Sequence, residues 1–493
     1  MTLALHRPLL RGPSSAVVAA HPLAVAAGME VSAAGGTAVD AAVAAAAALA
    51  VVAPEACGLG GDALLLVDVP GTRPVAFLGA GAAPRAPILP IERSGPASAG
   101  VPGAVAAWCG AHARLGALPL ADVLAPAVRL AVAGFPVSAQ LAAGLARRGS
   151  LLAEGAAGWV VAGAREGETL RQPELAVVLE AIAERGLDGF ARGWVAEAIG
   201  AATGPDGVAA ADLAVQAVEP EAPVAGTAGR ARLWVTPPPS QAALALLALR
   251  ALEGAPAPGT VAGEHAAIEA LKAAFEARPA LAATGDVDAL LAVELPPAPG
   301  RASDLRGPTG YEHTAAVATA DADGLVVSML ASVFHEFGSG VLVREAGFVL
   351  NNRLGGLLDA GHDAATPPPA GVRTPHTLSP MLLDLDARPL AVATPGADGQ
   401  VQILVQLVRL LAEAGAGIPE ALQAPRWRSV RGRLLVEASL DAGVRDGLAA
   451  RGHDLLVRPD GAMAFGAAAI AGLDADGLVA GADPRRETWA AVR

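Results

Sequence analysis

The chain has 493 residues, of which 53% are hydrophobic, 17% charged and 3% aromatic, and this composition excludes a protein that is disordered throughout. The formal net charge is −13 and the basic residues form no stripe. We therefore do not expect nucleic acid or an anionic membrane as a partner.

The first part of the chain is predicted to hold a strand, two helices and a second strand. These elements are expected at residues 16–22, 23–34, 37–52 and 63–69. Gly35-Gly36 separates the helices, and the tight turn Gly58–Asp62 precedes the second strand. The alanine-rich stretch 41–53 has 13 apolar residues, fewer than the roughly 20 that span a membrane. Because no signal peptide of ordinary form is visible either, we expect a cytoplasmic protein.

The rest of the chain alternates helices and strands without a regular strand–helix–strand repeat. Helical patterns alternate with Gly and Pro between residues 100 and 250, and residues 279–310 form a looser segment. Further helices are expected at 240–252, 265–278 and 401–414, and further strands at 233–235, 314–320, 325–332, 347–350 and 390–393. Such an alternation favours a layered α/β or α+β fold.

Cys57 and Cys109 are the two cysteines of the chain, and we expect both to be buried thiols. Their number excludes a disulfide framework, and no Cys/His cluster in the sequence has the spacing of a zinc site. Signatures of phosphate-binding loops, serine hydrolases and zinc peptidases are absent as well. We therefore predict no metal site.

Two hydroxyl residues fall together at the open end of the hairpin predicted around residues 321–324. If Ala322 and Asp323 form its tip, Thr314 lies opposite Ala331 and next to Ser332. The spacing alone leaves two interpretations open, a functional pair and two ordinary strand hydroxyls.

Nine short motifs resemble, in order and with similar gaps, those of the γ-glutamyltranspeptidase family of N-terminal-nucleophile hydrolases. They are Gly35–Ala42, Gly58–Asp62, Val101–Gly103, Pro237–Ser240, Thr314–Asp321, Phe337–Gly340, Leu350–Asn352, Ser379-Pro380 and Pro395-Gly396. The motifs extend over nearly the entire chain. The resemblance implies an α+β fold, the four-layer αββα sandwich of these hydrolases, and chemistry without a metal or organic cofactor.

In this family a precursor cuts itself before a threonine, and the matching residue is Thr314, preceded by His313. The resemblance implies a large subunit, 1–313, and a small subunit, 314–493, which form one intertwined catalytic domain and an α/β heterodimer from one chain. The resemblance leaves open whether this heterodimer assembles into a higher oligomer. Cleavage would give Thr314 an α-amine with an unperturbed pKa of roughly 8, suited to act as the base for its own hydroxyl.

Two further positions match residues of the family's reaction chemistry. Ser332 matches a second threonine that hydrogen-bonds the nucleophile, and serine keeps that hydroxyl. Pro395-Gly396-Ala397 matches the Pro-Gly-Gly turn whose backbone N–H groups bind the oxyanion. Ala397 can serve in this turn provided that its backbone needs no positive φ.

The residues that grip a γ-glutamyl group in the family do not match. The arginine for the α-carboxylate falls near Ala80, and the aspartate for the α-amine is Gly356. An asparagine, a glutamine and two serines are replaced by Phe334, Arg353 and the pair His376-Thr377. These replacements resemble a subgroup of the family that includes oxamate amidohydrolase.

Arg353, His376 and Thr377 are candidate substrate-binding residues, because an arginine fork suits a carboxylate, and Phe334 would shrink the pocket. The alternative is a surface arginine and a loop histidine that make local hydrogen bonds. We expect a self-processing amidohydrolase that acts on a small carboxylate-bearing amide of the oxamate type. The alternatives are a true γ-glutamyltransferase or glutathione hydrolase with a rearranged pocket, and a non-catalytic family member that binds a ligand.

Overall fold

The computed structural model describes residues 7–215, 217–308, 314–359 and 361–493. Within these residues two seven-stranded sheets face each other. The sheet that we call the β15 sheet has the strand order β1 (Leu10–Gly12), β20 (Gly477–Ala482), β19 (Ala469–Asp474), β15 (Pro389–Ala393), β14 (Met381–Leu385), β9 (Ala231–Val235) and β8 (Val224–Ala228). The β10 sheet has the order β21 (Trp489–Val492), β2 (Ser15–Ala19), β10 (Ala315–Asp321), β11 (Val326–Ser332), β3 (Asp62–Asp68), β4 (Val75–Gly79) and β7 (Pro220–Glu221).

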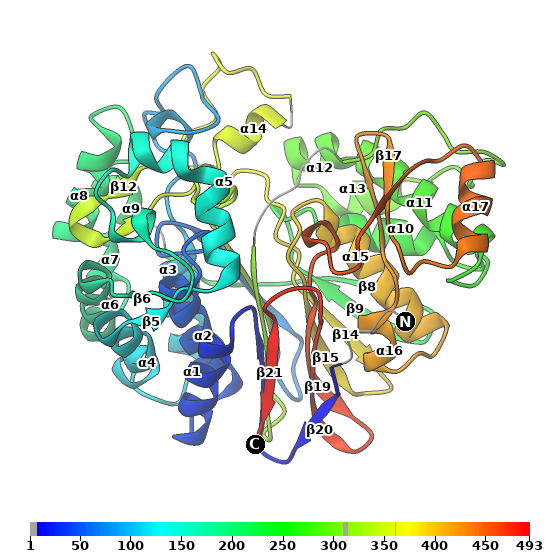
Figure 1. The fold of residues 1–493 in the computed structure, drawn as a ribbon, viewed down its shortest axis with the longest axis horizontal. Helices are drawn as coiled ribbons and strands as arrows, with labels where there is room; N and C mark the ends of the chain where they lie inside the picture. Colours follow the sequence, from blue (N-terminus) through cyan, green and yellow to red (C-terminus); the bar gives the residue numbers. More distant parts are fainter. Residues whose placement is uncertain (1–6, 216, 309–313, 360) are drawn as a thin grey trace.

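Helices cover the outer face of each sheet, so the molecule has four layers (Figure 1). The β10 sheet packs against α1 (Pro22–Ala33), α2 (Ala38–Val52) and α3 (Ala104–Leu115), and α4 (Leu120–Ala133) packs on α2. The β15 sheet packs against α10 (Ala243–Ala251), α11 (Val261–Glu276) and α15 (Gly399–Val408). A third core, rich in Ala and Leu, fills the space between the sheets. The predicted α+β fold, an αββα sandwich, is confirmed.

The remaining elements lie around these layers. The helices are α5 (Ala139–Gly155), α6 (Pro173–Arg185), α7 (Asp188–Ala191), α8 (Trp194–Thr203), α9 (Ala210–Leu213), α12 (Arg278–Thr284), α13 (Val287–Ala292), α14 (Gly355–Asp359), α16 (Ile418–Gln423) and α17 (Ala442–Ala450). The strands are β5 (Phe135–Pro136), β6 (Thr169–Leu170), β12 (Leu342–Val343), β13 (Phe348–Val349), β16 (Trp427–Val430), β17 (Arg433–Glu437) and β18 (Asp454–Arg458).

The alanine-rich stretch of the sequence is a buried core helix. Thr37 caps α2 by accepting a hydrogen bond from the Asp40 backbone N–H, and the Asp40 carboxylate accepts one from the Thr37 N–H. All residues of α2 are buried. Among the described ranges, no helix is both long enough and apolar enough to cross a membrane.

The hairpin of β10 and β11 is offset by one residue from the predicted register. Ala315 pairs with Ala331 and Ala320 with Val326, so Thr314 is level with Ser332 and not with Ala331. The cause is a longer turn: Asp321 N–H donates to Leu325 O, and Gly324 takes a φ of 90°. The correction places the two hydroxyl residues directly across from each other.

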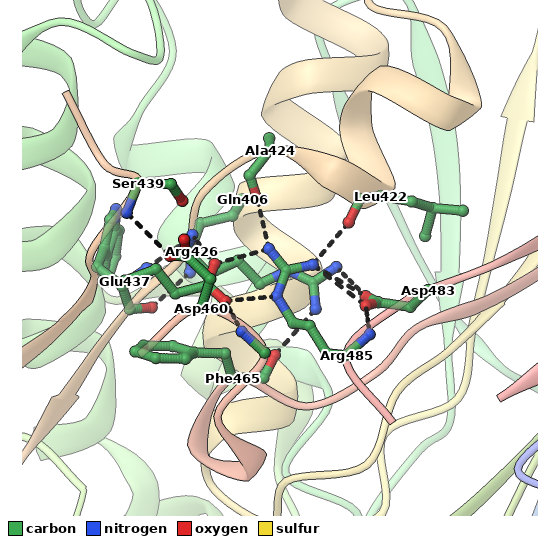
Figure 2. Close-up of polar contacts among 12 residues, drawn as sticks. Gln406, Leu422, Ala424, Arg426, Glu437, Ser439, Asp460, Phe465, Asp483 and Arg485 are labelled. Atoms are coloured by element: carbon green, nitrogen blue, oxygen red, sulfur yellow. Dashed lines mark hydrogen bonds and ion pairs between the residues drawn. The ribbon is translucent and has the colours of Figure 1, made fainter. Parts of the chain in front are cut away.

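Four charged side chains form a buried network beside β16 and β17 (Figure 2). Arg426 pairs with Asp483 at 2.6 Å, and Arg485 pairs with Glu437 at 2.7 Å and with Asp483 at 3.2 Å. The Arg485 guanidinium also donates to the carbonyls of Leu422 and Ala424. These contacts fix the C-terminal segment after β20 against the small sheet of β16, β17 and β18.

Candidate active site

Three polar residues lie side by side at one end of the β10 sheet. Thr314 immediately precedes β10, Ser332 ends β11, and Asp62 begins β3 in register with Ser332. Strand residues alternate between faces, and Leu64, Ala316 and Leu330 belong to the core between the sheets. Asp62, Thr314 and Ser332 are each two positions along the chain from one of these core residues. They therefore lie on the face that is turned toward the β15 sheet.

Asp62 is the centre of a buried hydrogen-bonded cluster that sequence reasoning missed. Its Oδ2 accepts from Arg353 Nε and from His376 Nε2, each at 3.0 Å, and its Oδ1 accepts from the Gly81 N–H at 2.9 Å. Burial opposes ionisation of Asp62, but Arg353, His376 and Gly81 outweigh it and hold the pKa of the carboxyl below its ordinary value. We call Asp62, Arg353 and His376 the Asp62 cluster.

His376 is a neutral member of this cluster at neutral pH. Burial and the neighbouring Arg353 lower its pKa to about 4, against the pull of Asp62. Its Nδ1 accepts from the Leu378 N–H at 3.3 Å, so Nε2 carries the proton that Asp62 accepts. Both ring nitrogens thus have protein partners, and His376 orients Asp62.

Phe334 and Gly356 fit together beside Arg353. The Arg353 guanidinium lies 4.4 Å from the centre of the Phe334 ring. A Cβ atom built on Gly356 would lie 2.6 Å from two ring atoms of Phe334. The ring therefore occupies the space that a side chain at position 356 would need, and the two departures from the family pattern are one packing change.

Ser332 also determines the backbone at Phe334. The Phe334 N–H donates to Ser332 Oγ at 2.9 Å, and Phe334 has a φ of 79°. A left-handed conformation is costly for an aromatic residue. The strained backbone turns the chain sharply after β11 and brings the ring over Gly356.

Glycines beside Asp62 allow three chain segments to meet. A Cβ on Gly61 would lie 2.5 Å from Ser332 O, and one on Gly81 would lie 1.7 Å from Val101 O. Asn351 joins the same segments, since its amide group bonds Gly60 O, Gly100 O and the Gly100 N–H. The Gly-Gly-Asp sequence was the available signal for Asp62, because close backbone approach and a buried acid coincide there.

The turn predicted to bind the oxyanion lies at the same end of the molecule. Met381 pairs with Val392, so the residues before β14 and after β15 leave the β15 sheet at the same end. The Ser379 N–H donates to Gln400 Oε1 at 2.8 Å and ties the two segments together. Because His376 bonds Asp62, this end faces Thr314 and Ser332.

Ala397 has a φ of 48°, so the turn does need a positive φ at this position, and the condition set for Ala397 in the sequence analysis is not met. The alanine tolerates a conformation that glycine adopts more readily. Gly396 and Ala397 accept hydrogen bonds from Gly399 N–H and Gln400 N–H. Within the described ranges, the N–H groups of Gly396 and Ala397 donate to no acceptor. Two adjacent free donors suit a developing oxyanion.

The other predicted residues are placed as follows. Thr377 is 6% exposed, and its hydroxyl makes no hydrogen bond to any described residue. Thr314 is 4% exposed. His313, on the other side of the predicted cleavage point, lies outside the described residues. The structure thus joins Arg353 and His376 through Asp62, which pairs with Ser332 across the strands. Phe334 contacts Arg353 and Ser332, and Thr314 lies across from Ser332.

Residues 24–492 match the family model described as gamma-glutamyltranspeptidase. The chain is 33% identical to the oxamate amidohydrolase proenzyme of Klebsiella pneumoniae, over 96% of this chain and 97% of that protein. It is 32% identical to the glutathione hydrolase-like YwrD proenzyme of Bacillus subtilis, with the same two coverages. The crystal structure of cephalosporin acylase from Bacillus halodurans superimposes with a TM-score of 0.88 at 30% identity, over 99% of this chain and 97% of that one.

Proposed function

This chain belongs to the γ-glutamyltranspeptidase family, and we propose that it is a self-processing amidohydrolase whose Thr314 cleaves a small carboxylate-bearing amide of the oxamate type. Membership makes the chain an N-terminal-nucleophile hydrolase, an enzyme of amide hydrolysis or acyl transfer. The observation that carries the substrate class is the position of the Phe334 ring, over Gly356 and against Arg353. The ring reduces the acyl pocket on the side where a longer, amino-bearing acyl group would extend.

Cleavage of the bond between His313 and Thr314 would divide the chain into residues 1–313 and 314–493. It would free the α-amine of Thr314, the base that the hydroxyl needs. The two products would stay associated because β10 lies between β2 and β11 and is hydrogen-bonded to both. One intertwined domain results from this arrangement.

The reaction would proceed through an acyl-enzyme. Thr314 Oγ1 attacks the amide carbonyl carbon while the α-amine takes its proton, and the N–H groups of Gly396 and Ala397 stabilise the oxyanion. Collapse breaks the C–N bond, and the α-ammonium returns the proton to the leaving nitrogen. A water molecule then cleaves the ester by the same route. Ser332, level with Thr314, orients the nucleophile.

Arg353 would bind the substrate carboxylate through its terminal Nη nitrogens, while its Nε donates to Asp62. His376 would hold Asp62, and the Thr377 hydroxyl would donate to the acyl group. A γ-glutamyl substrate also needs an anionic partner for its ammonium group. Asp62, the acid of the cluster, is already bonded to Arg353, His376 and Gly81, which supports the smaller substrate.

The test compares kcat/KM for oxamate and for a γ-glutamyl anilide on the processed protein. We expect oxamate to be hydrolysed with the higher kcat/KM, and Arg353→Lys to raise KM for oxamate more than it lowers kcat. Thr314→Ala should remain a single band on a denaturing gel, while the parent gives two. Efficient turnover of the anilide without action on oxamate would reject the substrate class. A small fragment that starts elsewhere than Thr314 would reject the nucleophile.

The packing argument has its own test in the pair Phe334 and Gly356. The double variant Phe334→Asn/Gly356→Asp frees the space and supplies a carboxylate for an ammonium group. We expect it to shift the ratio of anilide to oxamate kcat/KM by about tenfold or more toward the anilide. Gly356→Asp alone should lose activity on both substrates, because its Cβ would collide with the Phe334 ring. Equal ratios in parent and double variant would show that the ring does not select the substrate.

A further inference from the structure

Helix α11 presents two side chains with metal-ligand chemistry far from the Asp62 cluster. His265 and Glu269 are one helical turn apart and so lie on one face of the helix. His453, between α17 and β18, meets them there. The three residues are 1%, 4% and 7% exposed, and their ligand atoms all lie within 4.8 Å of one another. We call these three residues the His265 site.

The hydrogen bonds of His265 orient it as a ligand. Its Nε2 lies 2.6 Å from Pro299 O, so this nitrogen carries a proton and donates it to the carbonyl. Its Nδ1 lone pair then points at His453 Nε2, 2.8 Å away. One proton is shared between two imidazole nitrogens that face each other. A backbone carbonyl on the remote nitrogen is the arrangement that orients histidines on metal ions.

Glu269 is held in place by two groups, one of which competes with a metal ion. The Ser303 N–H donates to Oε2 at 3.1 Å, and Lys272 Nζ donates to Oε1 at 2.9 Å. Lys272 is the one lysine of the chain, and it also donates to Ser303 O at 3.3 Å. Its charge balances Glu269 in the metal-free state. If a divalent ion binds the Glu269 carboxylate, Lys272 can keep its hydrogen bond to Ser303 O.

A cavity of about 370 Å³ opens beside the His265 site. Lys272, Ser303, His453 and Asp454 are among the residues that line it. The cavity gives an ion a path to the ligands and leaves room for a water molecule to complete a tetrahedral shell.

We propose that His265, Glu269 and His453 bind one divalent transition-metal ion of the zinc type, which replaces the proton shared by the two histidines. Imidazole and carboxylate ligands favour zinc, cobalt and nickel over magnesium or calcium. The sequence does not show this site, because His265 and His453 are 188 positions apart. This proposal departs from the expectation, drawn from the sequence, that the chain has no metal site.

The site joins the two segments that processing would separate. His265 and Glu269 precede Thr314 in the chain, and His453 follows it. The ion would therefore cross-link the large and small subunits, and this consequence alone rests on the proposed function. Zn²⁺ should then raise the urea concentration at which the processed subunits separate.

The test measures Zn²⁺ binding to metal-stripped full-length protein by isothermal titration, in both the parent and the uncleaved Thr314→Ala variant. We expect one ion per chain in both, so a failure of processing does not affect the result. His453→Ala should weaken binding by about 100-fold or more. Lys272→Met should bind about tenfold more tightly, because it removes the competing cation. His362→Ala, in an exposed loop, is the control and should bind as the parent does.

Two results would overturn the site. One is the absence of stoichiometric binding in both the parent and Lys272→Met, which would make the cluster an internal hydrogen-bond network. The other is equal binding by the parent and His453→Ala, which would place the ion elsewhere. Co²⁺ in place of Zn²⁺ gives a second readout, because its visible spectrum reports coordination. That spectrum should change in His265→Gln if His265 is a ligand.

Discussion

Two buried ionic clusters serve different purposes in this molecule. The Arg426 network, made of Arg426, Glu437, Asp483 and Arg485, joins two cations to two anions. Every nitrogen of the Arg485 guanidinium donates to an acid or a carbonyl, and Asp483 also accepts from two backbone N–H groups (Figure 2). A network closed in this way fixes chain segments and leaves little for a ligand to bind.

The Asp62 cluster has one anion, one cation and a neutral imidazole, and it lies beside strained backbone. Phe334 and Ala397 at this end of the molecule have φ values of 79° and 48°. None of the four residues of the Arg426 network has a positive φ. Backbone strain next to a cluster that holds a candidate substrate-binding arginine is typical of a functional site. The contrast predicts that the Arg426 network determines stability and the Asp62 cluster determines activity.

The largest expected effect is on the stability of the Arg426 network. Asp483→Asn leaves two buried arginines with one carboxylate, and removal of one partner from a buried ion pair costs about 3–5 kcal/mol. Urea unfolding should show this loss, while kcat/KM per folded molecule stays within about twofold. Asp474→Asn, which removes a partly exposed partner of the exposed Arg11, is the control and should cost under about 1 kcal/mol. If the Asp483→Asn variant were as stable as the parent but inactive, the assignment of the Arg426 network to stability would be wrong.

Asp62→Asn tests the other side of the comparison. The variant leaves Arg353 buried without its carboxylate and releases the Nε that Asp62 holds. We expect kcat/KM to fall by about 100-fold or more, chiefly through KM, because the guanidinium no longer presents a fixed fork. Asp68→Asn, at the other end of β3, should change kcat/KM by less than about twofold. Wild-type KM in Asp62→Asn would show that the Asp62 cluster is scaffold only.

The pH dependence of stability separates the two clusters further. The pKa of His376 lies at about 4 in the folded protein, below its ordinary value of 6.5. The unfolded chain therefore binds more protons between these values, and His376 contributes stability above pH 6.5 that is lost as the pH falls toward 4. Asp483 has a pKa below its ordinary value of 3.8, so the Arg426 network loses stability only under more acidic conditions.

His376→Gln should remove this part of the pH dependence. Between pH 6.5 and 4 the parent should lose up to about 3 kcal/mol more free energy of unfolding than the variant, at about 1.4 kcal/mol for each pKa unit. Urea titrations of the two proteins across this range measure the difference. Parallel curves would mean that His376 titrates near its ordinary pKa and that its environment is more open.

Local patterns predicted part of the elements of the fold, and the resemblance predicted their arrangement. The segment 279–310, expected to be loose, holds most of α12 and all of α13. Apolar alternation indicated β10 and β11, and the Thr37–Asp40 cap marks the start of α2 as expected. The register was wrong by one residue, because the turn hydrogen bond from Asp321 to Leu325 depends on local backbone geometry that composition does not determine. Spacing could therefore place Thr314 near Ser332 but not level with it.

The site was predicted less completely because its contacts are long-range. Arg353 and His376 were identified as candidates, but their shared partner Asp62 is 291 and 314 positions away. No local pattern reveals such a contact. The coupling of Phe334 to Gly356 was equally hidden, since a glycine in the sequence does not show which ring fills its space.

The smallest expected effect comes from Ala397, where the strain at the active site can be relieved. Ala397→Gly removes the cost of a left-handed alanine, and the larger unfolded-state entropy of glycine offsets part of that gain. We expect the free energy of unfolding to rise by about 0.5–1 kcal/mol. The backbone N–H at position 397 remains, so kcat should stay within about twofold.

Ala393→Gly, four residues earlier at the end of β15, is the matched control. That residue is fully buried and has no positive φ, so the change loses packing and adds entropy to the unfolded chain. It should lower the free energy of unfolding by about 1 kcal/mol. Opposite signs for the two substitutions would locate backbone strain at the proposed oxyanion turn. A loss of stability in Ala397→Gly would show that the turn holds alanine without strain, and the contrast between the two clusters would then rest on Phe334 alone.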